Sequence, residues 1–155
     1  QAKELASLCK KYNSLFIVND RIDIALAVKA DGIHLGQEDI STKTARELLG
    51  SEKIIGRSTN CLKDIKKAEE EGCDYIGIGP IFLSETKKKL NPIGIDCLRK
   101  SSKKTLLPAF AIGGINSSNI NKLSQVNNLR IAVSDAIINS NDPFAKTEEL
   151  FKFLT

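Results

Sequence analysis

Short apolar segments alternate with longer amphipathic segments along the whole chain. The apolar segments are followed by polar or glycine residues, and most of them contain no charged side chain. Short, continuously apolar runs are typical of parallel strands that are covered on both faces. The pattern predicts about six strands: Leu15–Val18, Gly32–Leu35, Ile54–Gly56, Tyr75–Gly79, Ala109–Ile112 and Arg130–Val133.

The amphipathic segments between these strands predict helices. Gly50 and Gly72 follow two of them, in the place where glycine commonly ends a helix. The last segment carries an apolar stripe at helical spacing. The predicted helices are Ala2–Lys11, Asp23–Lys29, Thr42–Leu49, Leu62–Glu71, Asp96–Lys100, Ser118–Leu123 and Pro143–Phe153.

Strands that alternate with helices indicate parallel βαβ units, which occur in doubly wound sheets and in TIM barrels. A doubly wound sheet normally has a glycine-rich turn after its first strand, whereas Asn19-Asp20-Arg21 stands there. A TIM barrel instead places polar groups at the ends of many strands. We therefore expect residues 1–155 to form a single α/β domain of the TIM-barrel type.

Composition narrows the function classes. The chain has 155 residues, 41% of them hydrophobic, which is enough to bury a core. The net charge of +4 favours anionic ligands mildly, but the basic residues form no run and aromatic residues make up only 5%. Nucleic-acid binding is therefore not expected. No apolar run has the length of a membrane span, so no membrane partner is expected.

Cysteine usage predicts no zinc site. The four cysteines form no CxxC pair, and the chain has one histidine. Cysteines in predicted helices or at a strand start suit buried, reduced thiols in a cytoplasmic protein.

Asp20 and Asp39 follow the first two predicted strands. Two carboxylates at one edge suit Mg²⁺, which usually combines one or two carboxylates with phosphate oxygens. From the spacing alone the simpler interpretation is that each aspartate caps the following helix, because Asp is a common cap residue.

Other polar groups also follow predicted strands. Ser58, Thr59 and Asn60 suit either a phosphate or a helix cap, and Gly113-Gly114 suits either a backbone approach to a ligand or a plain tight turn. The run Ser84 to Lys87 suits an anion or a solvated loop. His34, inside a strand, is more often a packed histidine than a catalyst.

Taken together, these pieces resemble the thiamine-phosphate synthase family. The resemblance covers the chain from about Leu15 onward. The motifs that carry it, in the family's order, are Asn19-Asp20, HLGQED (34–39), GRST (56–59), GIGPIF (77–82), Thr86-Lys87 and AIGGI (111–115).

The resemblance implies a transferase with a (β/α)8 barrel. It would join hydroxymethylpyrimidine diphosphate to hydroxyethylthiazole phosphate, giving thiamine monophosphate and diphosphate. It implies that Asp20 and Asp39 bind Mg²⁺, and that Asn19, Ser58 and Lys87 contact the pyrimidine diphosphate, with Ser58 and Lys87 as catalytic residues. The thiazole phosphate would be contacted by a second set: Ser84, Thr86, Gly114, Ser134 and Asp135.

The chain departs from the family pattern in two places. The family barrel has two further strands, the second ending in an arginine-lysine pair that binds the diphosphate, ahead of the part that matches Gln1 onward. About six of eight βα units are therefore expected here, with a homo-oligomer or association with the missing segment to complete the barrel. Ser134-Asp135 also places a carboxylate near an expected anion, so that the backbone N–H of Asp135 would serve while its side chain turns away.

Two other functions remain open. A thiazole tautomerase of the same fold would need a histidine where Asn60 stands, and Asn60 cannot act as a general base. A non-catalytic barrel fragment that binds phosphate or thiamine is the alternative outside enzymes.

Overall fold

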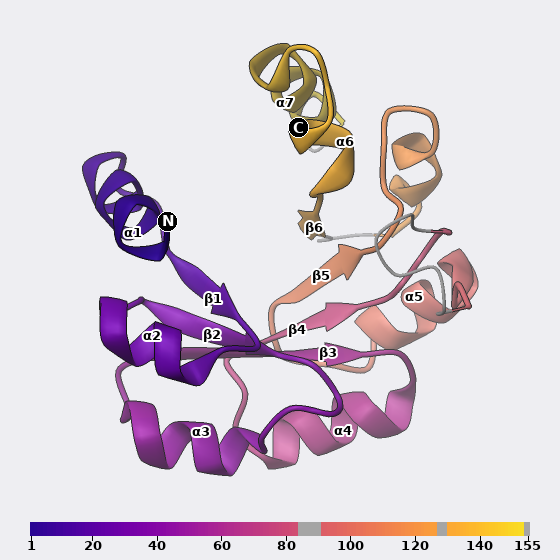
Figure 1. Cartoon of the computed structure of the whole chain (residues 1–155). Helices are drawn as coiled ribbons and strands as arrows, with labels where there is room; N and C mark the ends of the chain where they lie inside the picture. The colour runs from indigo at the N-terminus through magenta and orange to yellow at the C-terminus, as the bar shows by residue number, and fades with distance from the viewer. Residues whose placement is uncertain (84–90, 127–129, 154–155) are drawn as a thin grey trace.

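Six parallel strands form one curved sheet. The computed structural model describes residues 1–83, 91–126 and 130–153. Neighbours in the sheet are neighbours in the chain, in the order β1 to β6, so the strands make a half-barrel with helices α2 to α5 on one side (Figure 1). The strands are β1 (Ile17–Asn19), β2 (Gly32–Leu35), β3 (Ile54–Thr59), β4 (Tyr75–Ile78), β5 (Ala109–Ile112) and β6 (Arg130–Ala132).

The helices lie between the strands, as the amphipathic pattern predicts. The helical elements are α1 (Ala2–Lys11), α2 (Ile22–Val28), α3 (Thr42–Leu49), α4 (Leu62–Glu70), α5 (Gly94–Ser102), the 3₁₀ helix η1 (Ile120–Leu123), α6 (Asp135–Ile138) and α7 (Pro143–Phe151). The bounds of α1, α3, β2 and β5 match the expected ones. The segment expected as an α-helix at Ser118–Leu123 is a single 3₁₀ turn, and α6 was not expected. Four residues are too few to produce a helical period.

Strand β3 is three residues longer than its apolar run. Arg57, Ser58 and Thr59 remain in the strand because all three pair with β4, and Arg57 also pairs with β2. The buried Arg57 donates from Nη1 to the carbonyl of Ile40 at 2.8 Å, and Thr59 Oγ1 donates to the carbonyl of Gly77 at 3.0 Å. The polar side chains of Arg57 and Thr59 are therefore accommodated in a buried strand, because each has a hydrogen-bond partner.

The two faces of the sheet differ in kind. The convex face packs against the helices with fully buried aliphatic side chains: Ile33, Leu35, Ile55, Ile76 and Ile78. On the concave face, His34 is paired with Gly56 and Ser58 is paired with Gly77. Because side chains alternate along a strand, the apolar residues on one face leave the small and polar ones on the other.

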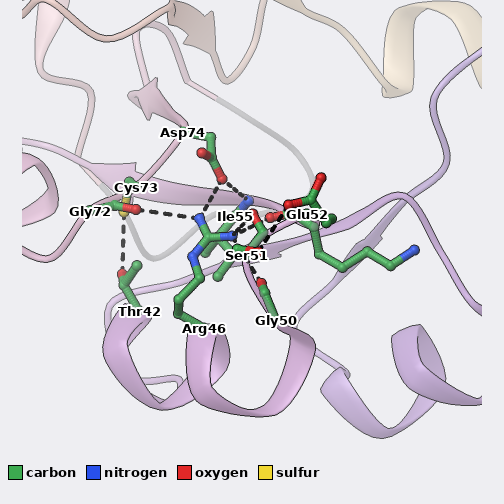
Figure 2. A network of polar contacts seen from close by, with 10 residues as sticks. Thr42, Arg46, Gly50, Ser51, Glu52, Ile55, Gly72, Cys73 and Asp74 are labelled. Carbon is green, nitrogen blue, oxygen red and sulfur yellow. Dashed lines mark hydrogen bonds and ion pairs between the residues drawn. The ribbon is translucent and has the colours of Figure 1, made fainter.

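Arg46 of α3 joins the amino ends of β3 and β4 (Figure 2). Its Nη2 lies 2.7 Å from Asp74 Oδ2, and the same oxygen accepts from the backbone N–H of Ile55 at 2.7 Å. The guanidinium also donates to four backbone carbonyls, those of Gly50, Ser51, Lys53 and Gly72. Arg46 thus supplies hydrogen bonds to carbonyls at the end of α3 and in the turns before β3 and β4, and ties this end of the sheet together.

All four cysteines are free thiols. Burial raises the pKa of Cys73, which matches the expected buried thiol. Cys61 is exposed, so the expectation of a buried thiol was wrong for that residue.

Within the described residues no helix is both long and apolar enough to cross a membrane.

Candidate functional site

The carboxyl ends of β1, β2 and β3 bring several predicted site residues to one rim. Asn19, the last residue of β1, is in register with His34 of β2. The backbone N–H of Asp20 donates to the carbonyl of His34 at 2.9 Å, and Gln37 Nε2 donates to the carbonyl of Ser58 at 3.2 Å. The ends of three adjacent strands are thus tied together, as the positions of these residues after predicted strands led us to expect.

The structure argues against helix capping for Asp39. Its Oδ2 accepts from the backbone N–H of Gly36 at 2.6 Å, within the turn that follows β2. The cap of α3 is Ser41, whose side chain accepts from the backbone N–H of Thr44. Asp39 is therefore oriented by its own turn, at the carboxyl end of the sheet.

Asp20 also lies outside the cap position. Its φ of 63° places it in the left-handed region, and the N-cap residue of α2 is Arg21, which makes no side-chain cap bond. Non-glycine residues adopt this conformation uncommonly, with Asp among the more tolerant types. The left-handed turn lets the chain leave β1 directly at the rim.

The donor set at this rim fits Mg²⁺. Asp20 and Asp39 supply two carboxylates from adjacent strand ends, and no group of three or more His, Cys, Asp or Glu side chains suited to a metal occurs in the described part of the chain. A small number of carboxylates completed by substrate oxygens and water is the arrangement Mg²⁺ usually takes. A fully protein-built cage, as for structural zinc, does not fit these residues.

Ser58 and His34 are in contact on the concave face. His34 Nε2 lies 2.9 Å from Ser58 Oγ, and its Nδ1 lies 3.0 Å from the hydroxyl of Tyr75. His34 is thus the packed, hydrogen-bonded histidine that was expected, and one of its partners is the predicted site residue Ser58. The helix-cap interpretation of Ser58 and Thr59 is wrong, because both lie in β3 and the N-cap residue of α4 is Cys61.

Gly113 and Gly114 follow β5 at the same edge of the sheet. Both have positive φ, 97° and 65°. A Cβ at Gly114 would lie 2.1 Å from the carbonyl oxygen of Leu83, so only glycine fits beside that segment. The carbonyl of Gly114 accepts from Asn119 Nδ2 at 2.8 Å, which holds the turn in place.

Ser134 and Asp135 lie between β6 and α6. Ser134 is the N-cap residue of α6 without a side-chain cap bond, and Asp135 is the first helical residue. Asp135 Oδ1 accepts from Asn139 Nδ2 at 2.6 Å. The carboxylate is thus engaged along its own helix, consistent with the expectation that only the backbone of Asp135 would serve an anion.

Three expected site residues lie outside the described part of the chain: Ser84, Thr86 and Lys87. Tyr75 was not expected in the site, although Gly56 on the neighbouring strand β3 is a signal that space is left on the concave face for a large side chain.

Comparisons with known proteins find relatives that match nearly the whole chain. The family model described as thiamine monophosphate synthase (TMP-TENI) matches residues 1–137. Thiamine-phosphate synthase of Prochlorococcus marinus (strain MIT 9313) is 57% identical over 154 residues, covering 99% of this chain and 44% of that protein. The protein of the same name from Thermosynechococcus vestitus is 45% identical over 99% of this chain and likewise 44% of its own length. The chain thus spans less than half the length of these curated relatives.

Solved structures show the same fold. Thiamine phosphate pyrophosphorylase from Pyrococcus furiosus is 38% identical, with a TM-score of 0.88 over 99% of this chain and 73% of that one. 3-Hexulose-6-phosphate synthase from Salmonella typhimurium superposes with a TM-score of 0.72 at 15% identity, covering 99% of this chain and 79% of that one, and this likeness concerns the fold alone. With the family model spanning most of its length, the chain belongs to the thiamine monophosphate synthase family.

Proposed function

We propose that the whole protein is a thiamine-phosphate synthase. It condenses hydroxymethylpyrimidine diphosphate with hydroxyethylthiazole phosphate and releases diphosphate. The observation that carries this proposal is the placement of Asp20 and Asp39 at adjacent strand ends, with Asp39 oriented by Gly36 instead of capping a helix. The relatives of that name, which match almost the whole chain, support it.

We further infer a TIM barrel in a cytoplasmic protein. The six parallel strands would be six of its eight βα units, and the curvature of the half-barrel supports this arrangement. The catalytic rim of such a barrel lies at the carboxyl ends of the strands, where the candidate residues are found.

The first half of the rim suits the diphosphate. Asp20 and Asp39 would hold Mg²⁺, which supplies charge neutralisation for the departing diphosphate. Asn19 and Ser58 offer hydrogen bonds beside that position, and Lys87 adds a positive charge. The aminopyrimidine ring can stabilise the cation left behind, so the chain has mainly to stabilise leaving-group charge and to hold the thiazole nitrogen in line.

The second half of the rim suits the thiazole phosphate. The Gly114 turn and the backbone before α6 would approach the phosphate, together with Ser84 and Thr86. Backbone turns after the late strands of a barrel commonly bind phosphate. Because the nitrogen of the thiazole is itself the nucleophile, the reaction needs no strong protein base.

The direct test is to incubate the whole protein with both substrates and Mg²⁺ and to detect thiamine phosphate chromatographically. Product that depends on both substrates and on Mg²⁺ is expected. Conversion of a thiazole tautomer without thiamine phosphate would assign the tautomerase function instead. Binding of phosphate with neither reaction would indicate the remaining alternative, a non-catalytic protein that binds phosphate.

A further inference from the structure

A polar chain crosses the concave face of the sheet from its amino end to its rim. It begins at Tyr75, the first residue of β4, whose hydroxyl lies 3.0 Å from His34 Nδ1. It continues through the imidazole to Ser58, whose Oγ lies 2.9 Å from His34 Nε2. The rings of Tyr75 and His34 lie 5.4 Å apart between centroids and are tilted by 33°. Three side chains from three different strands thus make one connected series.

Gly56 leaves the space that the Tyr75 ring occupies. A Cβ at Gly56 would lie 2.0 Å from Cζ and 2.5 Å from the hydroxyl of Tyr75. The His34 ring lies over Gly77, where an added Cβ would be 3.4 Å from Cε1, an ordinary van der Waals contact. Phe110 packs edge-on against the Tyr75 ring at 5.4 Å between centroids, which limits its movement. The position of the Tyr75 ring is therefore set by its neighbours on β3 and β5, and the contact with His34 does not arise from a loosely placed surface side chain.

The direction of the hydrogen bonds follows from the chemistry of the phenol. Burial raises the pKa of Tyr75 to about 12, so the hydroxyl keeps its proton at neutral pH. Within the described residues, the hydrogen-bond partner of this hydroxyl is His34 Nδ1. A buried O–H group that can donate will do so, because leaving it unpaired is costly. Nδ1 then accepts, and a neutral imidazole with an accepting Nδ1 carries its proton on Nε2.

The consequence reaches the rim through Ser58. With its proton on Nε2, His34 donates to Ser58 Oγ. The hydroxyl proton of Ser58 is then not used by the histidine and can be donated to a ligand. In the opposite tautomer the serine proton would be directed to His34 Nε2, away from the substrate.

We propose that Tyr75 is a positioning residue that fixes the Nε2–H tautomer of His34 and thereby presents Ser58 as a hydrogen-bond donor to an anionic substrate oxygen. The tautomer itself depends only on the geometry, whereas the role toward substrate rests on the proposed synthase function. A hydrogen bond from Ser58 to an oxygen that gains negative charge is stronger than a hydrogen bond between neutral groups. This orientation of the hydroxyl would therefore stabilise the charge of the leaving group.

The tautomer can be measured by two-bond ¹H–¹⁵N correlation spectra of the whole protein labelled at histidine, at a pH where the ring is neutral. The 155 residues contain a single histidine, and the loss of its signals in His34→Asn identifies them. We expect Nε2 to carry the proton in the wild type. In Tyr75→Phe, the Nδ1 resonance should shift downfield as its hydrogen bond is lost. Tyr12→Phe, at the other tyrosine, which is 68% exposed, should leave the spectrum unchanged.

A wild-type spectrum with the proton on Nδ1 would overturn the proposal, as would a Tyr75→Phe spectrum with an unchanged Nδ1 resonance. The wild-type measurement does not use Tyr75→Phe, so the proposal remains testable if that variant folds poorly.

Kinetics separate this proposal from the proposed function. Tyr75→Phe should lower kcat for thiamine phosphate formation roughly three- to tenfold, the loss typical of one hydrogen bond. Ser58→Ala should lower it at least as much, and Tyr75→Phe should cost little more in a protein that already carries Ser58→Ala, because both act through one group. An inactive wild type with the Nε2–H tautomer would contradict the synthase function alone. An active wild type whose kcat is unchanged in Tyr75→Phe would contradict the positioning role alone.

Discussion

Single aspartates of this chain look alike in the sequence but differ in the structure. Asp142 precedes α7 and accepts from the backbone N–H of Ala145 at 3.0 Å, which is ordinary N-capping. Asp39 stands three residues before the first residue of α3 and accepts from Gly36, behind it in the chain. The difference arises because Ser41 occupies the cap position of α3 and leaves the Asp39 carboxylate at the rim.

This difference predicts different effects of two matched substitutions. Asp39→Ala should lower kcat/KM about 100-fold, since it removes one of two proposed Mg²⁺ ligands. Asp142→Ala should instead cost about 1 kcal/mol of unfolding free energy through the lost cap, with activity retained. Steady-state assays over a range of Mg²⁺ concentrations and urea denaturation measure the two effects. Full activity of Asp39→Ala would refute the metal assignment.

Tyr75 predicts a loss of stability at alkaline pH. Its pKa is raised by burial to about 12 in the folded protein, from the ordinary value of 10.0 for a tyrosine. Between these values the unfolded chain releases a proton that the folded chain keeps, so unfolding becomes more favourable as pH rises. The contribution is fully present below pH about 10 and is lost as pH rises toward about 12. Urea denaturation across this range should show a steeper decline for the wild type than for Tyr75→Phe, and parallel curves would contradict the prediction.

At the scale of elements, helix α3 and strands β3 and β4 are held by one side chain. The Arg46 side chain is 27% exposed and donates to Asp74 and to carbonyls in two turns, those before β3 and before β4 (Figure 2). Hydrogen bonds from a charged donor to partly buried carbonyls are stronger than those between neutral groups. Arg46 therefore stabilises the amino ends of both strands, although in the sequence it occupies an ordinary polar position of an amphipathic helix.

Arg46→Met should lower the unfolding free energy by about 2 kcal/mol or more, because several backbone carbonyls lose their donor at once. Arg21→Gln is the matched control. Its ion pair with Asp23 is 64% exposed on the arginine side and is expected to contribute little. Denaturant midpoints of the two variants compare the effects directly, and equal midpoints would show that the Arg46 contacts are not stabilising.

At the scale of the whole molecule, the rim has two halves built from different strands. Asn19, Asp20, Asp39 and Ser58 come from the region of β1 to β3, whereas Gly114 and Ser134 follow β5 and β6. The curvature of the sheet turns both halves toward one side (Figure 1). Under the proposed function, the two anionic substrates would be bound by separate groups on the two halves, without sharing their binding residues.

Gly114→Ala tests this division. The substitution should raise the KM for the thiazole phosphate several-fold more than the KM for the pyrimidine diphosphate. Its Cβ would meet the Leu83 carbonyl and its φ of 65° disfavours alanine, so the turn must shift. Gly50→Ala, which also has positive φ but meets no atom within 4 Å, controls for backbone strain alone. Equal changes in both KM values would argue against separate halves.

Much of the fold could be predicted from local pattern because parallel strands and their covering helices have simple periods. The bounds of α1, α3, β2 and β5 follow from apolar runs and amphipathic spacing. The last three residues of β3 could not be predicted this way, since Arg57 and Thr59 are stabilised by Ile40 and Gly77, which are distant in the chain.

The sequence by itself determined the parallel α/β fold, the order of the motifs and the presence of polar groups after successive strands, because each is a local property of the chain. Only the tertiary structure decided what those groups contact. Whether Asp39 caps a helix depends on how the turn after β2 folds, and what lies beside His34 depends on the register between strands. The same register joins Tyr75 to Ser58 through His34, across 41 and then 24 positions of the chain.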